Sequence, residues 1–268
     1  MIDDQRVATA HNGAVVPGPE VRAALYANFA HAVPESVFVG RIYRLLWDRG
    51  FDETNTLACV GVCRDELTHP LVAKISAAWG EAFNFSSLAG LPLLGRTGFA
   101  AAAAHGPLVN GRRRYLFINL AHIALSASSE LGVCTRPGQL KPSRACGALW
   151  AIQDELEQGP LELTLDPTDL EQSLLKQRLS PMLRSESPLD IRRLTELTQR
   201  VSVENLRRLI ALGLDTTTSD YALVSGIQIH GPSGVDFVTP AVMEVVANGQ
   251  LEDLTAELQS AQLFRPGD

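Results

Sequence analysis

A cysteine, an arginine and two carboxylates follow one another directly after a short apolar run, in the stretch ACVGVCRDELTHP at residues 58–70. Cys63 can supply a thiolate, which serves as a metal ligand or as a nucleophile. Arg64 can hold a carboxylate such as Asp65 ionised through a charge-assisted hydrogen bond. Metal-binding and acid–base side chains therefore share one short segment of the chain.

Two more metal-binding residue types lie at the ends of predicted elements. The apolar run at residues 115–120 predicts a second buried strand, and His122 follows at its end. Ser143 can cap a helix that runs to Gly159, which places Cys146 in the first turn, where a thiolate is favoured. Two thiolates and one imidazole are typical of a tetrahedral Zn²⁺ site that keeps one position for water.

Spacing alone does not select this site. Cys63, His122 and Cys146 are far apart in the sequence and match no compact zinc-finger or ribbon motif. On spacing alone the plainer interpretation is preferred, with small cysteines filling the core and His122 as a hydrogen-bonded core residue. A thiol redox pair of Cys59 and Cys63 is a weaker alternative, because the pair lacks the exposed helix-start position of a redox Cys-x-x-Cys motif.

The elements that would position these residues alternate between helix and strand. Residues 36–49 have helical apolar spacing, and residues 57–62 form an apolar run typical of a strand buried on both faces of a parallel sheet. After Cys63, Thr68 and Pro70 begin another helix. The intervening loop is expected at the carboxyl end of the strand, where open α/β sheets place their binding crevices.

The rest of the chain extends this pattern. Further helices are predicted to begin near residues 166, 187 and 202, followed by a strand at residues 221–229 and a C-terminal helix at residues 242–258. Residues 1–20 have no sustained apolar period, which predicts an N-terminal arm. We expect residues 21–268 to form one α/β zinc-binding domain, with a mostly parallel central sheet flanked by helices and with helical additions around residues 160–215.

Composition excludes several classes of function. The chain has 268 residues and 46% hydrophobic content, enough to bury a large core. Its net charge is -7 and its only dense basic run is residues 112–114, so nucleic acid is not an expected partner. The longest purely apolar run, residues 99–104, is far shorter than the roughly 20 residues of a membrane span. The first residues show no export signal, which predicts a cytoplasmic protein with reduced cysteines.

Five separated stretches, in order, resemble a single known family. They are CRDEL at 63–67, RYLFINLAHIAL at 114–125, RPG at 136–138, SRACGAL at 143–149 and YALVSGIQIH at 221–230. Together they are similar to the limiting-CO2-inducible protein B family, which is related to the theta-class carbonic anhydrases and resembles the beta class. The resemblance spans roughly residues 55–230 and implies a β-carbonic-anhydrase-like α/β fold in a homodimer.

The same resemblance implies a site and an activity. Cys63, His122 and Cys146 are the implied Zn²⁺ ligands, and Asp65 with Arg64 is the implied catalytic pair. The implied reaction interconverts CO2 and bicarbonate, with zinc-bound hydroxide attacking CO2 while Arg64 holds Asp65 ionised and off the metal. The sequence departs from the β-class patterns Cys-x-Asp-Ser-Arg and His-x-x-Cys, since Arg64 precedes Asp65 and His122 lies well before Cys146.

A second function fits the same residues. A catalytically silent zinc-binding homologue could act as an assembly or regulatory partner in inorganic-carbon handling. For the enzyme, His69 and His105 are candidate proton relays, because an unperturbed histidine has a pKa near 6.5. An ordinary surface or capping role is nevertheless the preferred interpretation of each of these two histidines.

Overall fold

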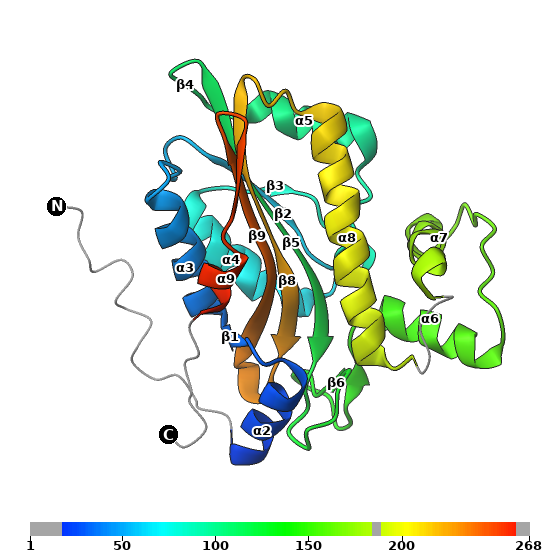
Figure 1. The fold of residues 1–268 in the computed structure, drawn as a ribbon. Coiled ribbons are helices and arrows are strands. Elements are labelled where there is room, and N and C mark those ends of the chain that lie inside the picture. Colours follow the sequence, from blue (N-terminus) through cyan, green and yellow to red (C-terminus); the bar gives the residue numbers. More distant parts are fainter. Residues whose placement is uncertain (1–17, 184–188, 261–268) are drawn as a thin grey trace.

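The computed structural model describes residues 18–183 and 189–260, and it shows a sheet with helices on both faces (Figure 1). The strands are β1 (Val33–Pro34), β2 (Leu57–Gly61), β3 (Phe83–Asn84), β4 (Leu108–Val109), β5 (Arg112–Ala124), β6 (Val133–Cys134), β7 (Ser143–Arg144), β8 (Ser219–His230), β9 (Asp236–Ala247) and β10 (Gln250–Asp253). The helices are α2 (Pro19–Asn28), α3 (Glu35–Trp47), α4 (His69–Trp79), α5 (Gly95–His105), α6 (Gly147–Gln158), α7 (Leu170–Leu183), α8 (Ile191–Gly213) and α9 (Thr255–Gln259). Three short 3-10 turns are η1 (Glu66–Thr68), η2 (Leu88–Gly90) and η3 (Pro232–Gly234).

Parallel strands form the centre of the main sheet, in the order β3-β2-β5-β8. β9 joins β8 in the antiparallel sense, and β1 and β10 pair with β9 in the same sense. β4 pairs with β5, and β6 and β7 form a separate small hairpin. The predicted fold class, a mostly parallel sheet flanked by helices, is confirmed.

Helices cover the two faces of the sheet unequally. Figure 1 shows α3, α4 and α9 on one side and the long helix α8 on the other. On the first side, Phe38 and Ile42 of α3 and Leu71 and Ile75 of α4 join strand residues in one buried cluster. Burial of each such side chain stabilises the fold by about 1.5–3 kcal/mol. The central strands are therefore covered on both faces, as their unbroken apolar runs predict.

The strands and helices around the predicted site lie where the sequence places them, with one difference that matters. α3, β2, α4 and α6 are confirmed. β5, however, does not end before His122 but continues to Ala124, because β8 pairs with it from Arg113 to Ala124. His122 is thus a strand residue, and Cys146 directly precedes α6 instead of lying inside its first turn.

The predicted C-terminal helix at residues 242–258 is wrong. The segment contains the end of β9, then β10, and only afterwards the short helix α9. Asn248 and Gly249 both have positive φ, 51° and 75°, as in the two-residue turns that join hairpin strands. The apolar residues before this turn serve the sheet, because β8 offers them an antiparallel partner along its full length.

Two other predictions differ in extent. The helix expected from residue 202 is the second half of the single long helix α8, and residues 184–188, where another helix start was predicted, lie outside the described residues. Residues 1–17 of the predicted arm also lie outside them, and α2 begins at Pro19. The helical additions expected around residues 160–215 correspond to α7 and α8. Within the described ranges, none of the helices has the length and apolar character needed to cross a membrane.

Candidate metal centre

Three side chains from distant parts of the chain meet near the carboxyl ends of the parallel strands. Cys63 follows β2, His122 lies near the end of β5, and Cys146 precedes α6. Their ligand atoms all lie within 4.8 Å of one another, and the two Sγ atoms are 3.6 Å apart. The structure therefore brings together the three residues that the sequence singled out.

Local hydrogen bonds explain how the segment after β2 presents Cys63. The Thr68 hydroxyl lies 3.0 Å from the Cys63 carbonyl oxygen and 2.9 Å from the Asp65 carbonyl oxygen. The Leu67 N–H donates to the Asp65 carboxylate over 3.2 Å and begins the turn η1. The loop is thereby closed on itself, and α4 starts immediately after it.

An unpartnered ring nitrogen shows that the cluster suits a metal. His122 is 1% exposed and its Nε2 has no hydrogen-bond partner, although buried polar atoms are normally paired. The Ala89 N–H of η2 donates to Cys63 Sγ over 3.3 Å, an arrangement that stabilises negative charge on sulfur. Two sulfurs and one neutral imidazole fit Zn²⁺ and leave a fourth position for water.

The two thiols titrate as a pair because they share a hydrogen bond. That bond from Cys146, together with the neighbouring His122, lowers the pKa of Cys63 in spite of burial. The bond to Cys63 and burial raise the pKa of Cys146, although the N–H groups of Ala148 and Leu149 at the start of α6 act in the opposite direction. One thiolate is therefore favoured before a metal binds, and a bound cation would favour the second.

The carboxylate of Asp65 is held by Arg136, from the loop between β6 and β7. Arg136 Nη2 donates to both Asp65 oxygens, over 3.2 and 3.0 Å, and Arg136 Nε donates to Glu66 Oε1 over 2.6 Å. The side chains of Arg136 and Asp65 are 17% and 11% exposed, so solvent screens this pair only partly. Among the described residues, the carboxylate is not a member of the Cys-His-Cys cluster. Asp65 is thus held beside the cluster but not in it.

The expected Arg64–Asp65 pair is not the one that the fold forms. Arg64 is 58% exposed and makes a two-point contact with Glu171 of α7, including an Nε–Oε2 hydrogen bond of 2.8 Å. The Leu88 N–H also donates to Glu171, which connects this ion pair to η2. Arg64 and Asp65 are consecutive, but their partners lie in different parts of the fold. A catalytic role for Arg64 itself stays a prediction.

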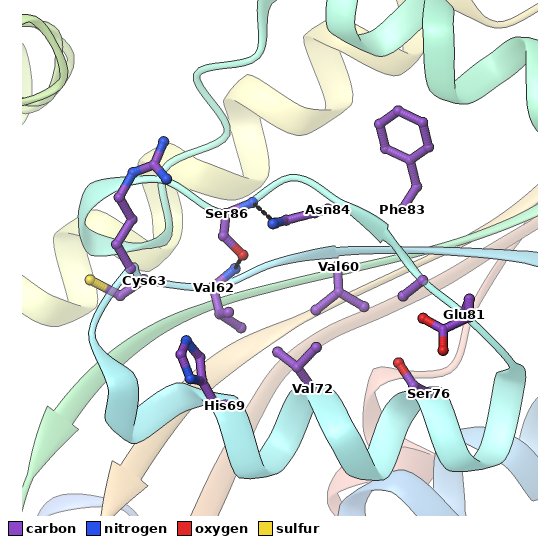
Figure 2. A pocket seen from close by; sticks show the side chains of 12 residues that line it. Val60, Val62, Cys63, His69, Val72, Ser76, Glu81, Phe83, Asn84 and Ser86 are labelled. Carbon is purple, nitrogen blue, oxygen red and sulfur yellow. Dashed lines mark hydrogen bonds between the residues drawn. The ribbon is translucent and has the colours of Figure 1, made fainter.

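A cavity of about 350 Å³ reaches Cys63 from the side of β3 (Figure 2). Figure 2 shows Cys63 and His69 toward one end of this cavity and Glu81 toward the other. A second cavity of about 280 Å³ is lined by Arg64 and Glu171. Arg64 lines both cavities, whereas Cys63 lines only the first, so the Arg64–Glu171 pair lies beside the cavity that reaches the cluster.

Other residues singled out in the sequence lie in different surroundings. Cys59 packs with Phe85 and Phe99 in a separate buried cluster, where burial raises the pKa of its thiol. Cys63 contacts the sulfur of Cys146 and belongs to a different buried cluster from Cys59, an arrangement that does not support a redox pair of Cys59 and Cys63. His69 lines the first cavity, whereas His105 is exposed at the end of α5, with Nδ1 2.6 Å from the Ala101 carbonyl oxygen.

Sequence reasoning missed the roles of three residues. Arg136 and Glu171 hold Asp65 and Arg64, and His230 contacts His122. Arg136 belongs to the RPG stretch and His230 ends the YALVSGIQIH stretch, so both lie within segments that carry the family resemblance. Glu171 had no sequence signal, because an acidic residue in the first turn of a helix is ordinary.

Comparisons with known proteins point to one family. The family model described as limiting CO2-inducible proteins B/C beta carbonic anhydrases matches residues 32–247. The crystal structure of limiting CO2-inducible protein LCIB is 31% identical, with a TM-score of 0.74, and the match covers 88% of this chain and 98% of that chain. PtLCIB4, a homologue of LCIB, is 25% identical with a TM-score of 0.74 and coverages of 87% and 98%. No curated protein matches the chain significantly.

Proposed function

This chain belongs to the family of limiting CO2-inducible proteins B/C beta carbonic anhydrases, and on that premise we propose that it is a zinc-dependent enzyme interconverting CO2 and bicarbonate. The observation that carries the proposal is the meeting of Cys63, His122 and Cys146, with a buried, unpartnered His122 Nε2 among them. The two Sγ atoms and this nitrogen would hold the metal. When bound, Zn²⁺ supplies activation of water near neutral pH.

Asp65 and Arg136 supply the positioning in this mechanism. A carboxylate oxygen has two lone pairs, so Asp65 can accept hydrogen bonds from Arg136 and from a reacting water at the same time. Arg136 holds the Asp65 carboxylate turned toward the β6–β7 hairpin, which would leave a fourth ligand position open to water when a metal is bound. The position of Asp65 thus favours the enzyme over the silent homologue.

The reaction joins water and CO2 and releases one proton with each bicarbonate. That proton has to leave a buried cluster, since Cys63 and Cys146 are only 4% and 1% exposed. The first cavity offers the route, because Cys63 and His69 both line it. We therefore retain His69 as the proposed proton relay and drop His105, which lies outside the lining of that cavity.

The deciding experiment is stopped-flow CO2 hydration by protein of verified zinc content. The Cys63→Ser variant is the matched control, since it removes one thiolate and changes the volume little. Zinc-dependent hydration that is lost in the variant supports the enzyme. One equivalent of zinc without hydration above the buffer rate supports the silent homologue, and absence of bound zinc overturns both functions.

Two further parts of the proposal concern the assembly and the compartment. We propose a homodimer on the strength of the family resemblance, and light scattering of the purified protein tests it. A monomer at micromolar concentration would overturn that proposal. The cytoplasmic location also stays a prediction, which localisation of a tagged chain in its native cell would test.

A further inference from the structure

A hydrogen-bonded chain of three side chains leads from His122 to a carboxylate outside the ligand cluster. His122 Nδ1 lies 3.0 Å from His230 Nε2, and His230 Nδ1 lies 3.3 Å from Asp236 Oδ2. The two rings meet edge to face, with centroids 5.1 Å apart and an interplanar angle of 72°. His122 and His230 are 1% and 2% exposed, so their ring nitrogens depend on one another for hydrogen bonding.

The sheet itself sets this alignment. β5 and β8 run parallel, and His230 is registered two positions beyond His122, so both side chains project from the same face. Asp236 opens β9 and is the direct antiparallel partner of His230. The Gly231 N–H also donates to Asp236 Oδ1 over 3.2 Å, which anchors the carboxylate within the β8–β9 connection. Three adjacent strands therefore deliver one residue each.

The order of donors and acceptors along this chain follows from its two ends. A carboxylate only accepts, so His230 Nδ1 carries the hydrogen that faces Asp236. In a neutral His230, Nε2 is then an acceptor and requires a hydrogen on His122 Nδ1. This hydrogen leaves His122 Nε2 with its lone pair free, and Nε2 is the nitrogen that has no partner in the protein.

We propose that His230 and Asp236 are positioning residues that select the metal-binding tautomer of His122 and hold its ring at the ligand cluster. The proposal deepens the proposed function, because it rests on the zinc centre, but it does not depend on CO2 hydration. Partners that bond to the second nitrogen of a ligating histidine commonly change metal affinity about 10- to 100-fold when removed. The alternative is that His230 only fills space between the strands.

Zinc affinity of the full-length protein separates the two explanations. Titration against a chromophoric chelator should show about 10- to 100-fold weaker zinc binding for His230→Phe, which fills the space but accepts no hydrogen bond. His230→Gln places an acceptor near the same position and should recover most of the lost affinity. His31→Phe, at an exposed histidine, is the matched control and should bind zinc like the unaltered chain.

Equal weakening in His230→Phe and His230→Gln, or no weakening in either, would overturn the proposal. If a variant fails to fold, the unaltered protein still tests the proposed tautomers. In a ¹⁵N-imidazole NMR spectrum of the zinc form, hydrogen on Nδ1 of both His122 and His230 is the expected result. Hydrogen on His230 Nε2 would contradict the proposed direction.

These readouts keep the proposal separate from the function. A zinc-loaded protein with the expected tautomers but no CO2 hydration would leave the positioning chain intact and overturn the enzyme. CO2 hydration by the unaltered protein, together with unchanged zinc affinity in His230→Phe, would support the enzyme and overturn the positioning role of His230. A chain that binds no zinc at all would overturn both.

Discussion

Arg136 lies 71 residues after Asp65 in the chain and donates hydrogen bonds to both carboxylate oxygens of Asp65. The contact joins the loop after β2 to the loop between β6 and β7. Arg136 Nη1 also donates to the Ser143 hydroxyl, so the arginine is held within its own hairpin. The orientation of Asp65 therefore depends on a small hairpin outside the main sheet.

Replacement of Arg136 by Ala should lower kcat/KM for CO2 hydration by about 10- to 100-fold. Without its guanidinium partner, the Asp65 carboxylate is free to turn to the metal and take the position of water. X-ray absorption of the zinc form should then show one more carboxylate oxygen in place of a water oxygen. Stopped-flow kinetics and this spectrum together check the prediction.

Arg64→Ala is the matched comparison, because Arg64 precedes Asp65 but pairs with Glu171. We expect a loss in kcat/KM of less than about 10-fold, since an ion pair this exposed contributes about 0–1 kcal/mol. A larger loss in Arg64→Ala than in Arg136→Ala would restore the pairing expected from the sequence and contradict the role given to Arg136.

Removal of zinc should destabilise the fold as well as abolish activity. A ligand bound only by the native state at 1,000 times its dissociation constant contributes about 4 kcal/mol. Calorimetry of the zinc form and of the chelator-treated form should show a lower Tm for the latter, with recovery on adding zinc back. Identical Tm values with and without bound zinc would show that the ligand cluster is not coupled to folding.

Gly90 should be sensitive to substitution because it connects η2 to the sheet. Its φ is +74°, and a Cβ at this position would collide with the Leu120 carbonyl oxygen. Gly90→Ala should cost about 3 kcal/mol or more of unfolding free energy and weaken zinc binding, since the neighbouring Ala89 N–H donates to Cys63 Sγ. Denaturant unfolding and chelator competition measure the two effects.

Gly80→Ala is the control for backbone strain. Gly80 has a similar φ of +81°, but a Cβ there would meet no heavy atom within 4 Å. We expect a cost of about 1–2 kcal/mol and no change in zinc affinity. Equal costs at the two glycines would mean that the contact with Leu120 is relieved by a small shift of η2.

Asp220 should give the fold a marked acid dependence. Burial of its side chain by itself raises the pKa of Asp220. Hydrogen bonds from Arg112 and from the Asn248 N–H, together with the charge of Arg114, lower this pKa by more than burial raises it. The pKa of Asp220 is therefore lowered on folding. The stabilisation is present above the unfolded pKa of about 3.9 and is lost as pH falls through the lower folded pKa.

Asp220→Asn should therefore destabilise the fold at pH 7, because it removes the buried anion that accepts hydrogen bonds from Arg112 and the Asn248 N–H. The difference in unfolding free energy between Asp220→Asn and the unaltered protein should shrink as the pH is lowered below about 4. Asp154→Asn, which breaks the exposed pair with Arg144, should cost about 0–1 kcal/mol at any of these pH values. A pH-independent cost of Asp220→Asn would contradict the linkage.

Much of the fold is readable from apolar patterns. The runs that became β2 and the first part of β5 are continuous and apolar because both faces of those strands are covered. The capping and proline signals at Thr68 and Pro70 predicted α4 because they act within one turn of helix. The dipeptide Asn248-Gly249 is typical of a two-residue hairpin turn, so the sequence also contains a signal that favours two strands over the predicted C-terminal helix.

The residue types and the family motifs singled out Cys63, His122 and Cys146. Local apolar runs and capping residues predicted that these three residues lie at the ends of strands or at the start of a helix. Their meeting within 4.8 Å belongs to the tertiary structure, because the register between β2 and β5 and the entry of α6 bring them together. The partners of charged side chains were decided in the same way. Arg64 and Asp65 are neighbours in the chain, yet Glu171 and Arg136 hold them, since a long side chain pairs with whatever the fold places within its reach.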